Sequence, residues 1–212
     1  TPLSALGPWA SVARAVNDAG VIVGSADDGI NVGVPCIWDA GGVRALGVET
    51  SSFGEALAIN DSGRVVGYSF TVRGTMAFAW DEVNGATDLG NLGGHHAQAN
   101  AVNDAGEIVG QSYIPGTSAT QHAFVWRNGT LVDLNDAVIN GAGWTLWNAT
   151  DITSDGRIVG GGVLNGQPHA FLLTPVVPAC AADIGGPGGT VGADGAVNNN
   201  DFIAFIDLFF AQ

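Results

Sequence analysis

Short apolar runs alternate with polar turn sequences along most of the chain. Four times, an apolar pair is followed by a polar tetrad that ends in Gly, and then by a run of the type Val/Ile-Val-Gly. Asn and Asp side chains hydrogen-bond the backbone two residues on, and Gly adopts positive φ, so the tetrad predicts a tight turn. β-branched residues on both sides of such a turn predict a β-hairpin. The four hairpins are expected at residues 15–24, 58–67, 101–110 and 151–160.

Two further elements recur after each hairpin. A run of small and aromatic residues predicts a third strand because its side chains alternate between the two faces of a sheet; it stands at 36–38, 77–80, 123–126 and 170–173. A run of the type Asp-Leu-Gly predicts a fourth strand at 44–47, 87–90 and 132–135. Four short antiparallel strands in about 40–45 residues match one propeller blade. We therefore expect an all-β fold, a small β-propeller of about four blades over residues 1–175.

The two ends of this array complement each other. The fourth unit stops after its third strand, and residues 3–7 (LSALG) resemble the fourth strand of the other units. Pairing of 3–7 with 170–174 would close a ring within one chain and remove a free sheet edge. The alternative is strand exchange, in which the spare strand fills the gap of a neighbouring molecule.

The ordered series of elements resembles the HAF repeat of bacterial extracellular proteins over about residues 3–174. The HAF tripeptide stands at 122–124 and 169–171, whereas Met replaces its His at position 76. The resemblance implies a β-rich repeat array that is secreted or exposed at the cell surface, and it implies no particular activity. Because His122 and His169 recur at one repeat position, we expect them to make structural hydrogen bonds between neighbouring strands or blades.

Residues 176–212 differ in composition, because a Pro-rich linker and a Gly-rich stretch precede an apolar end. The sequence Asp-Gly-x-Val-Asn-x-x-Asp from position 194 resembles the calcium loop of a dockerin repeat, in which oxygen ligands surround Ca²⁺. The resemblance implies these ligands: Asp183, Asp194, the carbonyl of Ala196, Asn198 and Asp201. Seven extra residues separate the first two ligands, and a dockerin has two such repeats where this chain has one. The alternative is a helix cap without metal.

Residues 202–210 are apolar on nearly every side and are expected to form a short helix that needs cover. A dockerin-like element implies a partner, so the candidate partner-binding residues are Phe202, Phe205, Ile206, Phe209 and Phe210. The partner would be a second copy, in a head-to-tail homopolymer, or a cohesin-like surface protein. The other possibility is that this helix docks on its own propeller.

Charge restricts the partners further. The chain has 20 acidic and 6 basic residues, a formal net charge of -14. A field of this sign repels nucleic acid and anionic lipid, and no apolar run reaches the roughly 18 residues of a membrane span. The two cysteines, Cys36 and Cys180, could form one disulfide or remain buried thiols.

Motifs of catalysis are not found in the sequence: it has no Gly-x-Ser-x-Gly elbow, phosphate loop or dinucleotide fingerprint. Trp38, Trp80 and Trp126 recur at one repeat position and are expected in the core. Three Trp residues break the repeat and are candidates for a ligand surface: Trp9, Trp144 and Trp147.

These observations predict a secreted, non-catalytic structural or adhesive protein with Ca²⁺ in its tail. It would anchor to a surface or assemble with copies of itself. The alternative is a carbohydrate-binding propeller whose site lies around the three irregular Trp residues.

Overall fold

The structure is a computed structural model that describes residues 2–116, 120–175 and 206–208. Within them the regular secondary structure is almost entirely antiparallel β-sheet, as the hydrophobic pattern predicts. Sheet one contains β1 (Ser11–Val16), β2 (Ile22–Ala26), β3 (Val34–Asp39) and β4 (Gly42–Ala45). Sheet two contains β5 (Gly54–Ile59), β6 (Val65–Thr71), β7 (Gly74–Asp81) and β8 (Gly85–Asp88). Sheet three contains β9 (Ala97–Val102), β10 (Ile108–Tyr113), β11 (Gln121–Arg127) and β12 (Thr130–Asp133).

Sheet four departs from this plan. A single helical turn, α1 (Leu134–Ala137), and the short β13 (Val138–Ile139) lead into β14 (Trp144–Ile152), β15 (Ile158–Leu164) and β16 (Gln167–Pro175). The strand β17 (Ile206–Leu208) lies between β13 and β16 and completes the order β13-β17-β16-β15-β14.

The predicted hairpin turns form as their sequences require. In the first turn the backbone N–H of Gly20 donates to the carbonyl oxygen of Asn17 at 2.9 Å, and Gly20 has a φ of 77°. The Asn17 side-chain oxygen accepts the N–H of Val21 at 3.0 Å and fixes the start of β2. The glycine that ends each Val/Ile-Val-Gly run has a different role. A Cβ atom at Gly67, for example, would clash with the carbonyl oxygen of Glu55 on the neighbouring strand.

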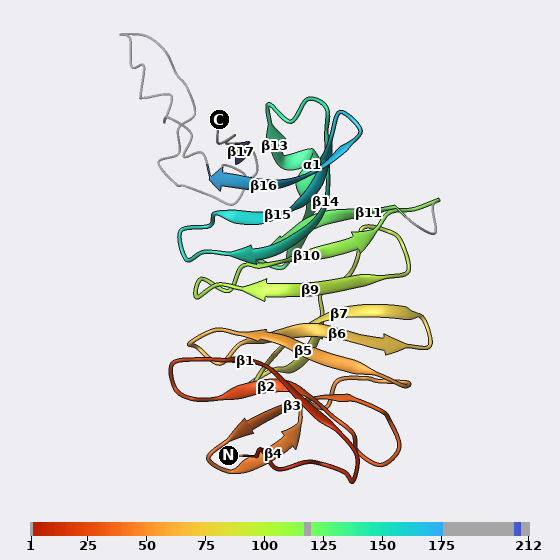
Figure 1. The fold of residues 1–212 in the computed structure, drawn as a ribbon, viewed down its shortest axis with the longest axis vertical. Coiled ribbons are helices and arrows are strands. Elements are labelled where there is room, and N and C mark those ends of the chain that lie inside the picture. Colours follow the sequence, from red (N-terminus) through yellow and green to blue (C-terminus); the bar gives the residue numbers. More distant parts are fainter. Residues whose placement is uncertain (1, 117–119, 176–205, 209–212) are drawn as a thin grey trace, which may run out of the picture.

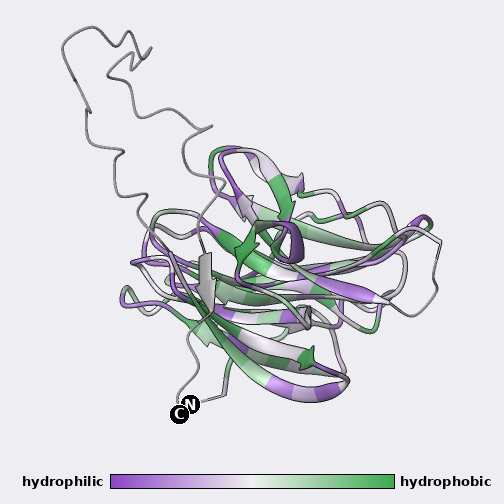
Figure 2. Ribbon diagram, turned by 90° about the horizontal axis from the view of Figure 1, so that it is seen from above, coloured by the Kyte–Doolittle hydropathy of each residue, from purple (hydrophilic) through white to green (hydrophobic). Residues whose placement is uncertain are grey.

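The four sheets follow one another along the long axis of the molecule, from β1–β4 at one end to β14–β17 at the other (Figure 1). A separate apolar cluster fills each of the three interfaces; that between sheets two and three includes Val66, Leu89, Ile108 and Phe124. The view down the stack shows hydrophobic segments gathered in the strands (Figure 2). Sheets one and four lie at opposite ends, so the described residues form an open stack.

A ladder of side-chain amides links the turns of successive sheets. The Nδ2 atom of Asn17 donates to the carbonyl oxygen of Asn60 at 3.2 Å, and Asn60 donates in the same way to Asn103 at 2.9 Å. Asn103 then donates to the carbonyl oxygen of Thr153 at 3.0 Å. Thr153 occupies the Asn position of the fourth unit, and it has no side-chain amide that could donate a hydrogen bond to a further turn. We call these three bonds the Asn ladder; it ends at sheet four.

The prediction that residues 3–7 pair with 170–174 is wrong. Residues 3–7 form no strand, and they lie against the outer side of sheet one. Leu6 packs against the buried Ala26, Cys36 and Trp38, and the Trp38 Nε1 atom donates to the carbonyl oxygen of Ser4 at 2.6 Å. The segment therefore covers the apolar outer face of the first sheet instead of crossing to the fourth.

The expected helix at 202–210 is also wrong where the structure describes it. Residues 206–208 form β17, which pairs antiparallel with β16 (Leu173 opposite Leu208) and parallel with β13. The free edge of β16 offers backbone hydrogen bonds that an isolated short helix would not gain. The tail thus supplies the strand that the fourth unit lacks, and Ile206, a candidate partner residue, pairs through its backbone within its own chain.

Candidate functional site: a pocket between sheets two and three

A pocket of about 230 Å³ opens between sheets two and three. One part of its lining is aromatic and comes from β6, β10 and the loop before β9: Tyr68, Phe70, His96 and Tyr113. The other part consists of side-chain amides from β9, β10 and β11: Gln98, Gln111 and Gln121. Phe70 and His96 are exposed, so the pocket is accessible from solvent.

The aromatic rings are held by one another and by one hydrogen bond. Tyr68 and Phe70 lie with ring centroids 5.9 Å apart, and both contact Phe53 at 6.1 Å. His96 stands edge-on to Tyr113 at 5.0 Å, and its Nδ1 atom is 2.7 Å from the Thr75 hydroxyl. These contacts fix the faces that the rings present to the pocket.

The interface that holds the pocket lacks the polar pair that links the other two interfaces. Between sheets one and two, Arg14 forms a bidentate ion pair with Glu55, with N–O distances of 2.7 and 3.0 Å. Between sheets three and four, the corresponding residues are Asn100 and Asn148, whose side chains bond at 2.7 Å. Between sheets two and three the Arg14 position holds Leu57, which cannot pair with Gln98. The Gln98 amide instead donates to Asn100 on its own strand at 2.9 Å.

The Arg14–Glu55 pair shapes the electrostatics beside the pocket. Glu55 is buried, with 4 % of its side chain exposed, and its carboxylate raises the pKa of Arg14. Burial, followed by the Glu55 charge, raises the pKa of Tyr68. Tyr68 therefore keeps its phenol proton at neutral pH. Asp, Glu, Lys and Arg are absent from the described residues that line the pocket.

The Trp residues predicted as a ligand surface do not come together. Trp9 is 82 % exposed and lies before sheet one, whereas Trp144 and Trp147 belong to β14 of sheet four. The Trp147 indole covers Gly161, where any side chain would collide with it. Trp144 packs edge-on against His169 and Phe171 at 6.1 and 6.5 Å. The glycine run 160–162 thus provides flat space for two indoles.

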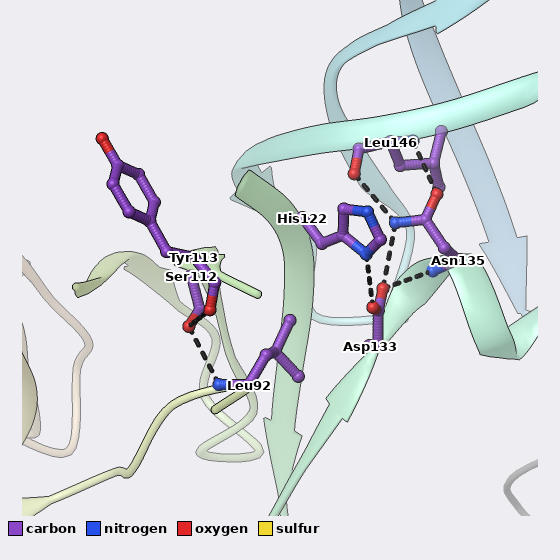
Figure 3. A network of polar contacts seen from close by, with 7 residues as sticks. All are labelled: Leu92, Ser112, Tyr113, His122, Asp133, Asn135 and Leu146. Atoms are coloured by element: carbon purple, nitrogen blue, oxygen red, sulfur yellow. Dashed lines mark hydrogen bonds and ion pairs between the residues drawn. The ribbon is translucent and has the colours of Figure 1, made fainter. Parts of the chain in front are cut away.

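The structural hydrogen bond predicted for His122 is confirmed. Its Nδ1 atom lies 2.6 Å from a carboxylate oxygen of Asp133 on the neighbouring β12 (Figure 3). Asp133 also accepts the backbone N–H of Asn135 at 2.8 Å and so caps α1. Asn135 exchanges two hydrogen bonds with the backbone of Leu146 at 2.7 and 2.9 Å and ties α1 to β14.

The core prediction for the repeated Trp residues is confirmed as well. Trp38 and Trp80 are 4 % and 6 % exposed, and the partly buried Trp126 packs on the cluster between sheets two and three. Guanidinium groups lie over two of these rings: Arg44 over Trp80 at 5.3 Å and Arg64 over Trp126 at 5.0 Å.

Most tail residues predicted as site residues lie outside the described residues. These are the calcium-ligand candidates Asp183, Asp194, Ala196, Asn198 and Asp201 and the partner candidates Phe202, Phe205, Phe209 and Phe210. Elsewhere, in the part of the chain that the structure describes, no group of three or more His, Cys, Asp or Glu residues is placed to hold a metal. Cys180 also lies outside it; Cys36 is a fully buried thiol, and burial raises its pKa to about 12.

The sequence signal for the pocket is a departure from the repeat. Ser25 and Asp27 of the first unit become Tyr68 and Phe70 in the second, at the same positions of the second strand. A search for residues that the units share therefore does not find these pocket residues.

Models of known protein families and the curated proteins contain no match to this chain. In the described residues, no helix has the length and apolarity needed to cross a membrane.

Proposed function

We propose that this chain is a non-catalytic structural or adhesive repeat protein that is secreted and acts outside the cell or at its surface. The observation that carries the proposal is the Asn ladder, because one amide-to-carbonyl bond recurs at all three interfaces of the stack. Together with a buried apolar cluster at each interface, it favours a stiff body over a set of loosely tethered sheets. A rigid stack suits a protein that attaches to a surface and holds other groups at a fixed distance from it. The extracellular location rests on the resemblance to HAF repeats.

The tail is the proposed attachment element. In this proposal Asp183, Asp194, Ala196, Asn198 and Asp201 hold Ca²⁺, and the neighbouring apolar residues contact a second copy or a cohesin-like surface protein. The position of β17 supports a close link between tail and stack, since residues 206–208 extend sheet four. A metal-ordered tail would therefore act directly on one end of the array.

Light scattering of the purified full chain tests this role. With Ca²⁺ we expect a mass above that of the monomer, and with a chelator a lower one. Asp194→Ala in the full chain should reproduce the chelated state while keeping β17. A full chain that stays monomeric at high concentration, with and without Ca²⁺, would contradict self-assembly.

Ring closure is part of the same proposal. The first three units each have the four meandering antiparallel strands of a propeller blade, and the fourth has three of them; the described residues form an open stack. A propeller would then need units from more than one chain. Closure predicts a small fixed multiple of the monomer mass, whereas head-to-tail growth predicts a broad distribution.

Carbohydrate binding is a second candidate function, and the pocket between sheets two and three is the observation that favours it. Aromatic faces and side-chain amides converge there, and such groups suit a ligand that has both apolar and hydroxylated sides.

A further inference from the structure

We propose that the pocket between sheets two and three binds one neutral sugar ring, as a free saccharide or as one ring of a glycan. This inference gives the second candidate function a defined site, and it rests on that function rather than on the structural role. The site differs from the Trp residues that the sequence suggests.

Size limits the ligand. The pocket measures about 230 Å³, below the roughly 300–1,000 Å³ of pockets that enclose drug-sized molecules. A single six-membered ring is an appropriate occupant. The exposed Phe70 and His96 leave the pocket accessible from solvent, so further sugars of a glycan could extend outwards.

The lining selects for a neutral, hydroxylated ligand. The aromatic residues offer ring faces, on which the C–H side of a sugar ring can pack. The Gln side chains offer both a donor and an acceptor, which suits hydroxyl groups. The described lining has no carboxylate, ammonium or guanidinium group, and a chain with a net charge of -14 repels anionic ligands.

The amides are available for a ligand. Gln98 uses its Nε2 atom for Asn100, which leaves its side-chain oxygen without a partner among the described residues. Within the same residues, the side chains of Gln111 and Gln121 make no hydrogen bond to protein. All three are half-buried, so water or a ligand must satisfy them, and a fitting ligand can replace ordered water with little loss.

The site is specific to one interface. The Gln98 position holds Glu55 in the first interface, where it pairs with Arg14, and Asn148 in the third, where it bonds to Asn100. The stack is therefore expected to carry one sugar site and to bind with a stoichiometry of one per chain.

A glycan array with neutral and charged glycans, followed by saturation-transfer NMR with methyl glycosides of glucose, galactose, mannose and N-acetylglucosamine, tests the inference. Gln111→Ala and Gln121→Ala should each weaken binding about tenfold or more, since each removes a ligand contact from a half-buried site. Trp9→Ala and Trp147→Ala are the matched controls and should bind as the unchanged chain does. Circular dichroism verifies that every variant is folded.

The outcomes separate the site from the function. Loss of binding only in the Gln variants supports the pocket. Sugar binding that survives in the Gln variants and is lost in Trp147→Ala or Trp9→Ala overturns the pocket and keeps the lectin-like function. No saturable binding to any neutral glycan overturns both, and the light-scattering test of the structural role stands apart from either result.

Discussion

Asn60 lies in the middle of the Asn ladder and offers the sharpest test of how the stack is held together. Its Nδ2 atom donates across the interface to the carbonyl oxygen of Asn103, and its Oδ1 atom accepts the N–H of Arg64 and the hydroxyl of Ser62, both at 2.8 Å. The first bond joins two sheets, while the other two shape the turn. Asn60 is 5 % exposed, so water cannot easily replace these bonds.

The fourth unit provides a substitution that separates the two roles. Thr153 stands in the Asn position there, and its hydroxyl accepts the N–H of Arg157 at 3.0 Å, as Asn60 accepts that of Arg64. Asn60→Thr should therefore keep the turn and remove the bond between sheets. Asn60→Ala should remove both.

The expected magnitudes follow from the number of bonds lost. Asn60→Thr loses one cross-interface bond, while the Asn103 carbonyl keeps the N–H of Gly106 at 2.9 Å, so the free energy of unfolding should fall by about 1 kcal/mol. Asn60→Ala also leaves the Arg64 N–H without its acceptor, and about 2–3 kcal/mol is expected. For a chain of this size these changes lower Tm by roughly 2–4 °C and 5–10 °C.

Urea unfolding followed by Trp fluorescence measures these differences. Thr153→Asn is the control, because no further turn follows it in the described stack and the added amide should bring no gain. A smaller m-value in the Asn60 variants would indicate that sheets one and two unfold apart from sheets three and four. If Asn60→Thr is as stable as the unchanged chain, the ladder does not couple the sheets. If Asn60→Thr loses as much stability as Asn60→Ala, Thr does not preserve the turn at this position.

Three further predictions concern the buried Cys36 thiol and one close backbone approach. Cys36 should resist a thiol reagent at pH 8 in a Cys180→Ser chain and react only on unfolding, because its pKa of about 12 keeps it protonated; rapid labelling of the native chain would contradict this. The same shift leaves stability unchanged below about pH 9 and lowers it between about pH 9 and 12, where the unfolded thiol ionises and the folded one does not; a Cys36→Ala chain should lack that part of the loss. Gly110→Ala should destabilise the fold by about 3 kcal/mol or more in urea unfolding, since the new Cβ meets the Gln98 carbonyl. Gly129→Ala, at a φ of 81° with open space around it, should cost only about 1 kcal/mol, and equal effects of the two changes would refute the steric argument.

Local structure was predictable from the sequence wherever the repeat holds. The third-strand run at 77–80 lies inside β7, and each predicted turn has the hydrogen bonds that its Asn or Thr side chain provides. These features are formed by residues close together in the sequence, and the same pattern occurs in four units. A repeated residue is therefore a reliable guide to what every interface needs.

The ends were not predictable in the same way, because strand partners are decided by competition between segments far apart in sequence. Residues 3–7 resemble a fourth strand, yet the apolar face formed by Ala26, Cys36 and Trp38 lies close to them along the chain and is covered by Leu6. The β16 edge then pairs with 206–208, a segment whose apolar run equally suited a helix. The pocket was missed for the opposite reason, since it arises from residues that differ between units.

The end of the Asn ladder at Thr153 gives the stack a direction. Asn60 and Asn103 each accept a bond from the turn before and donate one to the turn after, whereas Thr153 accepts one and donates none to another unit. Internal duplication of a 43-residue unit would thus continue the series, because the inserted Asn would find an acceptor on one side and a donor on the other. A unit joined after the fourth would meet no donor. The length of such an array can consequently change by insertion of units within it, whereas its last unit must stay at the end.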